Sequence, residues 1–97
     1  MSVATFLCSV EMYGFPREIA PFRSVEILLT DGAQMADVIA GIKNAIPELD
    51  SLAFKSKENR LADLYKFNVN GHLYYDGEDF KLHQGDKIAL LTLMTGG

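Results

Sequence analysis

The residues whose type and position suggest chemistry are the last two of the sequence, Gly96 and Gly97. Glycine has no Cβ, so a backbone of two glycines can enter a narrow channel that any side chain would block. The carboxylate of Gly97 is then available as a reacting group in another protein's active site. A frayed terminus is the alternative interpretation, so the value of this pair depends on the residues that precede it.

Conventional catalytic motifs are absent from the sequence. It has no P-loop, dinucleotide fingerprint, zinc-protease motif or nucleophile elbow. Asp76, Glu78 and Asp79 lie close to His83, which is conceivable as a metal or acid–base site, but a solvated acidic turn is the favoured interpretation. Cys8 alternates with apolar residues and is expected to be a buried, inert thiol. We therefore predict no metal site.

Composition narrows the class of protein further. The 97 residues are 48% hydrophobic and 23% charged, values typical of one folded domain, which we assign to residues 1–97. The 9 basic and 13 acidic residues give a net charge of −4 and no basic run, which disfavours binding to nucleic acid or an anionic membrane. No apolar run approaches the roughly 20 residues that span a bilayer. A single cysteine and the lack of a basic N-terminal region favour a reduced, cytoplasmic setting.

Apolar periodicity predicts the elements of the first half. Residues 3–13 and 24–30 alternate like strands, and the glycine- and proline-containing stretch 14–23 is expected to be a loop. A helix is expected over about 34–46, because its apolar residues recur on one helical stripe. That stripe consists of Met35, Val38, Ile39, Ile42 and Ile46.

The ends of this helix have their own signals. Asp31, three residues before Gln34, predicts a capping box with an acidic cap and a glutamine that reaches back. Pro47 disfavours helical geometry at Ile46, so the helix ends there or just before. Residues 48–63 carry no clear pattern. Their expected apolar anchors are Leu49, Leu52 and Phe54.

Three strands are expected in the second half. Residues 65–69 alternate, and Asn70-Gly71 is a strong hairpin signal that leads into a short return strand at 72–75. The nearly continuous apolar run 87–94 predicts a last strand that is central or has its outer face covered.

The order strand, strand, helix, strand, short strand, strand predicts an α+β fold, with one main helix packed across one mixed sheet. The first and last strands are the longest and most apolar, so we expect them to pair at the centre. The helical crossover permits a parallel pairing. Residues 95–97 remain as a flexible, uncharged tail.

Several short stretches, taken in order, resemble one family. They are Tyr13-Gly14 with Arg17–Ala20, Asp31–Ile39, Pro47–Leu49, Val69-Asn70-Gly71, Gly85–Ala89 and the terminal Thr95-Gly96-Gly97. On these stretches the chain resembles the small sulfur-carrier proteins of the molybdopterin-synthase and thiamine-pathway type. Their fold is the ubiquitin-like β-grasp, which has the predicted order of elements.

The resemblance implies that the chain is a co-substrate of other enzymes. An E1-like enzyme would use ATP to adenylate the carboxylate of Gly97. A sulfur donor, such as a cysteine desulfurase or rhodanese-type protein, would then convert the adenylate to a thiocarboxylate. The acceptor would be a synthase subunit in molybdenum or tungsten pterin cofactor assembly, the preferred pathway, or a thiazole synthase in thiamine biosynthesis. The chain itself would bind no cofactor.

Other functions for the same fold stay open. The chain could be a ubiquitin-like modifier of protein lysines or a tRNA-thiolation carrier, both of which share the activation step. It could also be a β-grasp interaction module whose tail does not react.

Partner-facing residues are implied by the same resemblance. Gly96 and Gly97 would supply reach and the reacting group, and Thr95 would lead them into the partner's pocket. The positions that match the family's partner-facing residues are Tyr13, Leu73, Leu91 and, near that interface, Arg17. A place in the core is the alternative interpretation for the two leucines.

Overall fold

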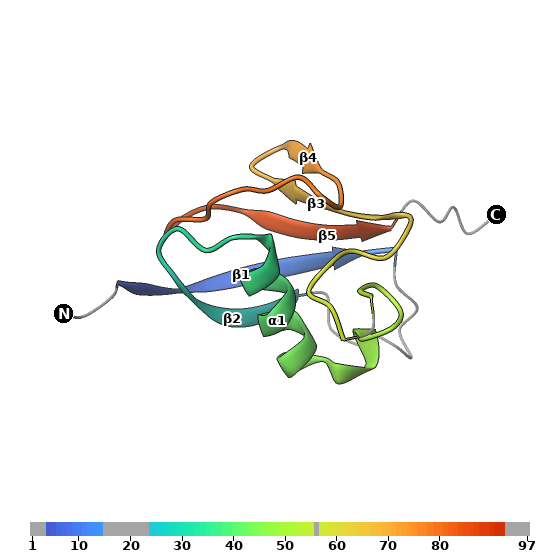
Figure 1. Ribbon diagram of the computed structural model, residues 1–97. Helices are drawn as coiled ribbons and strands as arrows, with labels where there is room; N and C mark the ends of the chain where they lie inside the picture. Colours follow the sequence, from blue (N-terminus) through green and yellow to red (C-terminus); the bar gives the residue numbers. More distant parts are fainter. Residues whose placement is uncertain (1–3, 15–23, 56, 93–97) are drawn as a thin grey trace.

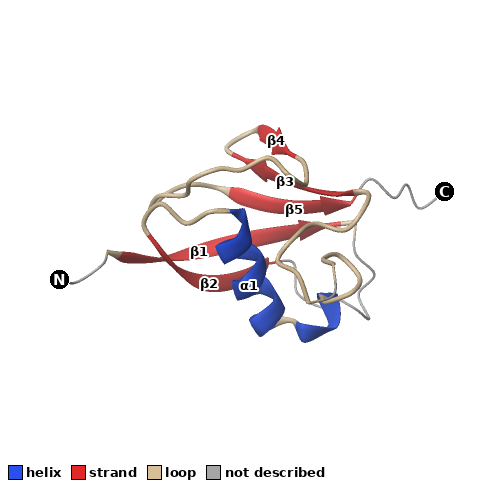
Figure 2. Ribbon diagram, in the orientation of Figure 1, coloured by secondary structure: helices blue, strands red, loops and turns tan. Residues whose placement is uncertain are grey.

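The computed structural model describes residues 4–14, 24–55 and 57–92. In this part of the chain one main helix lies across one face of a five-stranded sheet, which confirms the predicted α+β architecture (Figures 1 and 2). The elements are β1 (Thr5–Tyr13), β2 (Ser24–Thr30), α1 (Met35–Ala45), the 3₁₀ helix η1 (Pro47–Leu49), β3 (Tyr65–Val69), β4 (His72–Tyr74) and β5 (Ile88–Thr92). Several predicted elements are slightly too long, and the predicted extension of the last strand to residue 94 lies outside the described residues.

The order of strands in the sheet is β2-β1-β5-β3-β4. β1 and β5 lie side by side and parallel, with Val10 opposite Ile88 and Tyr13 opposite Leu91. The other neighbouring pairs are antiparallel. This confirms a mixed sheet in which the first and last strands pair at the centre.

The sheet has an inner face, which is on the same side as α1 and forms part of the core, and an outer face. Along β1 the even-numbered residues are buried and the odd-numbered ones are exposed, as the alternation predicts. The predicted stripe of α1 is buried as well. Phe80 and Leu82 anchor the loop before β5 in the same core. The largest fully buried side chains are Phe54, Phe67, Ile39, Ile42, Leu49, Leu61, Leu82, Leu90, Val10 and Val38.

The predicted cap of α1 is wrong. Gln34, not Asp31, is the N-cap, and its backbone N–H donates to the Asp37 carboxylate at 2.9 Å. The physical reason is that Ala33 forms an isolated β-bridge with Leu82, so the chain stays extended past the turn at Asp31 before the helix begins. The predicted end is confirmed, because α1 stops at residue 45, shortly before the proline.

Residues 50–55 and 57–63, for which the sequence shows no pattern, form an irregular segment. Phe54 is buried as expected, and so are Ala53 and Leu61, but Leu52 is 36% exposed. The expectation that Leu52 is an anchor is therefore wrong. It follows Ser51, which has a left-handed backbone conformation with a φ of 72°.

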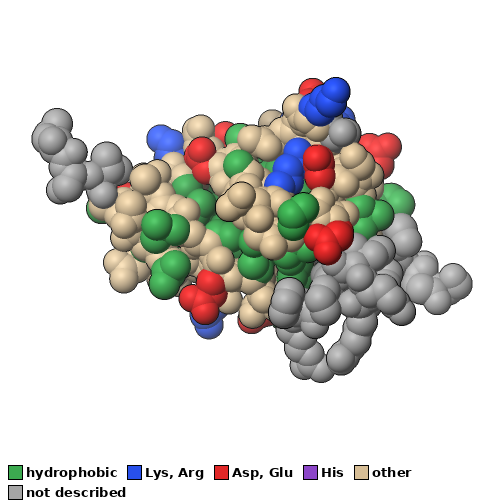
Figure 3. All heavy atoms as spheres, turned by 90° about the horizontal axis from the view of Figure 1, so that it is seen from below, with side chains coloured by type: hydrophobic (Ala, Val, Ile, Leu, Met, Phe, Trp, Pro, Cys, Tyr) green, Lys and Arg blue, Asp and Glu red, His purple; other side chains and the backbone are tan. Residues whose placement is uncertain are grey.

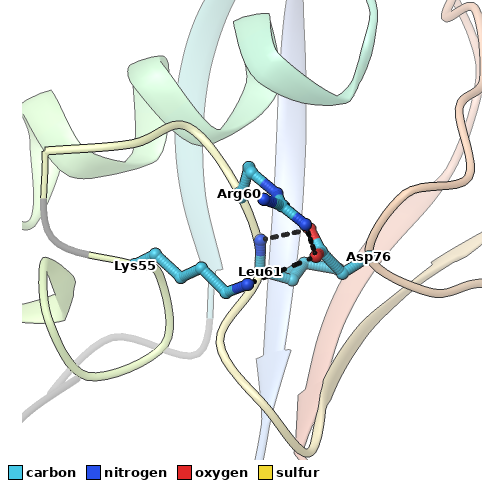
Figure 4. A network of polar contacts seen from close by, with 4 residues as sticks. All are labelled: Lys55, Arg60, Leu61 and Asp76. Atoms are coloured by element: carbon cyan, nitrogen blue, oxygen red, sulfur yellow. Dashed lines mark hydrogen bonds and ion pairs between the residues drawn. The ribbon is translucent and has the colours of Figure 1, made fainter.

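Asp76 ties this segment to the turn that follows β4 (Figure 4). Its carboxylate accepts hydrogen bonds from the Arg60 guanidinium at 2.7 Å and the Leu61 backbone N–H at 3.1 Å, and it lies 3.7 Å from Lys55 Nζ. Partial burial alone would raise the pKa of Asp76. The hydrogen bonds from Arg60 and Leu61, together with the two positive charges, outweigh burial and lower this pKa below its usual value.

Candidate functional site: the end of β5 and the outer sheet face

The last strand, β5, ends between its two neighbours in the sheet, β1 and β3. Leu91 lies opposite Tyr13 of β1 and Lys66 of β3, and Thr92 lies opposite Tyr65 of β3. In Figure 1 the ends of β1 and β5 lie at the same edge. The backbone of β5 is therefore paired with a neighbouring strand up to its last residue, Thr92. The predicted site residues Thr95, Gly96, Gly97 and Arg17 lie outside the described residues.

Gly14 lies against this end of the strand. Its φ is +84°, a left-handed conformation that favours glycine. A Cβ built on Gly14 would lie 2.4 Å from Thr92 Cγ2 and 3.5 Å from the Thr92 carbonyl oxygen. Thr92 therefore occupies the space that a side chain at position 14 would need.

Tyr13, Leu73 and Leu91 lie on the outer face of the sheet. Residues opposite each other on neighbouring strands share a face, and the register connects Tyr13 with Leu91, Leu91 with Lys66, and Leu73 with Asn68. Tyr13 is 52% and Leu73 38% exposed, and Leu91 is half-buried. The two leucines lie outside the buried core, so the core interpretation is wrong for both.

Lys66 is part of this face, and the sequence analysis did not single it out. It is 4% exposed, and its Nζ lies 4.2 Å from the centroid of the Tyr75 ring. A positive charge over an aromatic ring is attracted by the ring's quadrupole. Strand alternation places Lys66 and Phe67 on different faces of β3, but it contains no signal that the charge of Lys66 lies over the Tyr75 ring.

A shallow groove of about 570 Å³ follows the outer face along β5. Ala89 has the smallest side chain on this face of β5, and it lies between Glu11 and Asn68 on the neighbouring strands. The groove is lined by both apolar and polar side chains, among them Leu7, Tyr13, Leu91, Ser9, Glu11, Asn68 and Lys87. Such a surface can accept a protein segment with both polar and apolar side chains.

On the side of the molecule that is seen from below, hydrophobic side chains are interspersed with charged ones. The view from below shows green side chains in several places, with acidic and basic side chains between them (Figure 3). Leu7 and Leu28 are each 66% exposed and lie opposite each other on β1 and β2. They belong to the outer face, at the end of β1 remote from Tyr13.

The acidic turn near His83 uses its carboxylates to bind backbone groups. Asp79 accepts a hydrogen bond from the Met35 N–H at 3.0 Å, and Glu78 accepts one from the Tyr75 N–H at 2.9 Å. His83 Nδ1 lies 2.8 Å from a carboxylate oxygen of Asp31, in the turn before α1. This arrangement agrees with the interpretation as an acidic turn rather than a catalytic cluster.

Cys8 lies on the inner face of β1 and is 3% exposed, which confirms that it is buried. Burial, with a smaller contribution from the charge of Asp86, raises the pKa of the thiol. A raised pKa leaves little of the reactive thiolate at neutral pH, as expected for an inert thiol.

The fold and the site together define a class of protein. The five-stranded mixed sheet with one helix across it is the ubiquitin-like β-grasp fold. Comparison with known proteins takes this further. Residues 10–97 match the model of the ThiS family, and the chain belongs to that family of ubiquitin-like sulfur carriers.

Solved structures with the same fold include two of one archaeal protein. The crystal structure of SAMP1 from Haloferax volcanii has a TM-score of 0.76 and 25% identity, over 95% of this chain and 100% of that chain. A crystal structure of H. volcanii small archaeal modifier protein 1 has a TM-score of 0.72 and 24% identity, over 89% and 95%. The solution structure of SAMP1 from Methanosarcina acetivorans has a TM-score of 0.68 and 21% identity, over 100% of both chains. Against the curated proteins the sequence has no significant match.

Family membership confirms the predicted class and its general role. Small carriers of this type are not catalytic, so the chain is not an enzyme, and they work with E1-like activating enzymes. In the part of the chain that the structure describes, no helix has the length and apolar character needed to cross a membrane.

Proposed function

We propose that this chain is a sulfur carrier whose Gly97 carboxylate is adenylated by an E1-like enzyme and then converted to a thiocarboxylate. The observation that carries the proposal is the short distance along the chain between an anchored central strand and the Gly-Gly pair. β5 ends at Thr92, and Gly97 is five residues further on. Because a chain advances at most about 3.5 Å per residue, five residues can carry the carboxylate at most about 17 Å beyond Thr92. The family match extends through Gly97, which supports the proposal.

Activation turns a poor electrophile into a good one. An oxygen of the Gly97 carboxylate attacks the α-phosphorus of ATP, pyrophosphate leaves, and the resulting acyl adenylate carries AMP as its leaving group. The terminal sulfur of a donor persulfide attacks the acyl carbon and displaces AMP, which forms an acyl disulfide. A second thiol reduces this disulfide, so the thiocarboxylate stays on Gly97 and the donor leaves as a mixed disulfide. The chain supplies the carboxylate, and the enzymes supply the acids, bases and ATP site.

Docking would use the outer face near the end of β5. Tyr13 and Leu91 lie there, and Leu73 lies on the same face of the edge strand β4. Exposed aromatic residues such as Tyr13 are frequent in binding hot spots. Thr95 and Gly96 would lead the carboxylate into the enzyme, and Arg17 would contact the partner near the same interface. The donor would be a cysteine desulfurase or rhodanese-type protein. A synthase subunit of molybdenum or tungsten pterin assembly is the preferred acceptor, and a thiazole synthase the second.

The test is the intact mass of the protein after incubation with ATP, a cognate E1-like enzyme and a persulfide source. We expect a gain equal to the exchange of one oxygen for sulfur in the full chain. The matched control is the variant that lacks Gly97, which should show no gain. If the full chain gains no mass with an activating enzyme that is active on another carrier, the proposal is wrong.

Conjugation to protein lysines is the second candidate function. The observation that favours it is the similarity to SAMP1, a small archaeal modifier protein, at 25% identity over nearly the whole chain. Both functions begin with the same adenylate, and they differ in whether sulfur or a lysine amine attacks it. In a cell extract with ATP, a conjugate of higher mass that requires Gly97 would favour the modifier, whereas free thiocarboxylate alone would favour the carrier.

A further inference from the structure

We propose that Gly14 is a positioning residue: its lack of a side chain fixes the direction in which the chain leaves β5, and so presents Gly97 to the activating enzyme. The inference rests on the proposed function and deepens it. Gly14 follows directly on Tyr13, the last residue of β1, whose partner on β5 is Leu91. The parallel register thus brings residue 14 beside Thr92, at the point where the tail begins.

The contact between the two residues leaves no room for a side chain. A Cβ on Gly14 would lie 2.4 Å from Thr92 Cγ2, whereas two carbons in optimal contact lie about 3.5–4.0 Å apart. A side chain at position 14 must therefore displace Thr92 by about 1 Å or more. The next nearest atom is the Thr92 carbonyl oxygen, at 3.5 Å, so the backbone adjoins this space as well.

Thr92 has little freedom to adapt without moving the tail. On its other side it is paired with Tyr65 of β3. Its branched Cβ restricts the side-chain torsion, so the methyl group cannot simply rotate into an arbitrary position. A displacement of Thr92 is therefore passed to the residues that follow it. A misplacement of about 1 Å can reduce a reaction rate by about a hundredfold when the reacting group depends on it.

The chain contains matched controls for the cost of the backbone conformation. Gly32 has a φ of +83° and Gly77 a φ of +92°, close to the +84° of Gly14, but a Cβ at either would meet nothing within 4 Å. Alanine at Gly32 or Gly77 therefore carries the same conformational cost without the contact. Thr92→Ser removes the methyl group that the new Cβ would meet.

The experiment measures ATP–pyrophosphate exchange by a cognate E1-like enzyme as a function of carrier concentration. For Gly14→Ala we expect kcat to fall at least tenfold with KM changed less than threefold, because docking by the outer face is retained. Gly32→Ala should stay within twofold of the unchanged chain. The double variant Gly14→Ala with Thr92→Ser should recover most of the lost kcat. Urea unfolding of the same variants separates this effect from a destabilised fold, because Thr92→Ser relieves the contact in either case.

Two further measurements keep the outcome clear. Thr92→Ile enlarges the side chain that contacts Gly14 while Gly14 itself is kept. It should therefore lower kcat, and it can be measured even if Gly14→Ala does not fold. Amide chemical shifts of residues 93–97 should change in Gly14→Ala and stay unchanged in Gly32→Ala, independently of any enzyme. Unchanged shifts, equal kcat in Gly14→Ala and Gly32→Ala, or no rescue by Thr92→Ser would overturn the role of Gly14. Absence of exchange with the unchanged chain would instead contradict the proposed function.

Discussion

The inner and outer faces of the sheet are built from the same strands but differ in what covers them. On β1, Val10 is fully buried in the core, while the adjacent Glu11 and the nearby Tyr13 point outward and are exposed. No element among the described residues covers the outer face as α1 covers the inner one. Burial on the inner face therefore stabilises the fold, whereas the outer face remains accessible for binding a partner.

The largest effect is expected from a charge on the inner face. Val38→Asp places an unpaired carboxylate where the side chain is fully buried, which we expect to lower the free energy of unfolding by at least about 3 kcal/mol. The control is Ala40→Asp, at an exposed position of the same helix. Urea unfolding measures both. Equal midpoints would mean that the inner face tolerates charge and that the comparison fails.

A charge on the outer face should affect binding instead. Leu73→Asp should raise KM for the activating enzyme about tenfold, about 1.4 kcal/mol of binding free energy, with less than about 1 kcal/mol change in stability. Its control is Leu28→Asp, also on the outer face but at the end remote from Tyr13. Kinetics of ATP–pyrophosphate exchange would check both variants. An equal effect of the two would extend the docking surface over the whole face, and no effect of either would exclude this face.

A smaller effect is expected where charge holds the irregular segment 50–63 in place. Because the pKa of Asp76 is lowered in the folded state, its contribution to stability is present above the unfolded value of 3.8 and is lost as the pH falls through the folded pKa. Asp76→Asn should therefore lower the urea midpoint at pH 7, and the difference from the unchanged chain should shrink below pH 3.8. Asp63→Asn, at an exposed position, is the control. A difference that does not depend on pH would contradict this role of the carboxylate.

The smallest effect on stability is expected at the tail. Removal of Gly96 and Gly97 should change the free energy of unfolding by less than about 0.5 kcal/mol, as for surface changes in general, while it abolishes activation. Thermal or urea unfolding, together with the intact-mass assay, measures the two effects. A loss of more than about 1 kcal/mol would show that the tail is structural and would weaken the proposed function.

Most of the fold was predictable because the signals are local. The alternation in β1, the stripe of α1 and the Asn70-Gly71 turn each depend on residues close together in the chain, and each is confirmed. The errors arose where distant residues decide. Asp31 is not the cap because Ala33 bridges to Leu82 of another loop, and Leu52, which follows the left-handed residue Ser51, is exposed.

The site divides in the same way. The chemistry of glycine singled out the Gly-Gly pair, and the resemblance singled out Tyr13, Leu73 and Leu91. Neither indicated that the charge of Lys66 lies over the Tyr75 ring or that Gly14 meets Thr92. Both contacts join residues that are distant in sequence or lie on different strands, so no local pattern encodes them.

By itself, the sequence determined the elements, the faces they present and the family, because periodicity and turn residues act over a few positions. The sequence predicted the central pairing of β1 and β5, but only the tertiary structure fixed its parallel direction and its register. That pairing depends on where the α1 crossover returns the chain and on how the strands pack against the helix. It brings Gly14 to Thr92 and Tyr13 to Leu91, and so places the docking face beside the start of the tail.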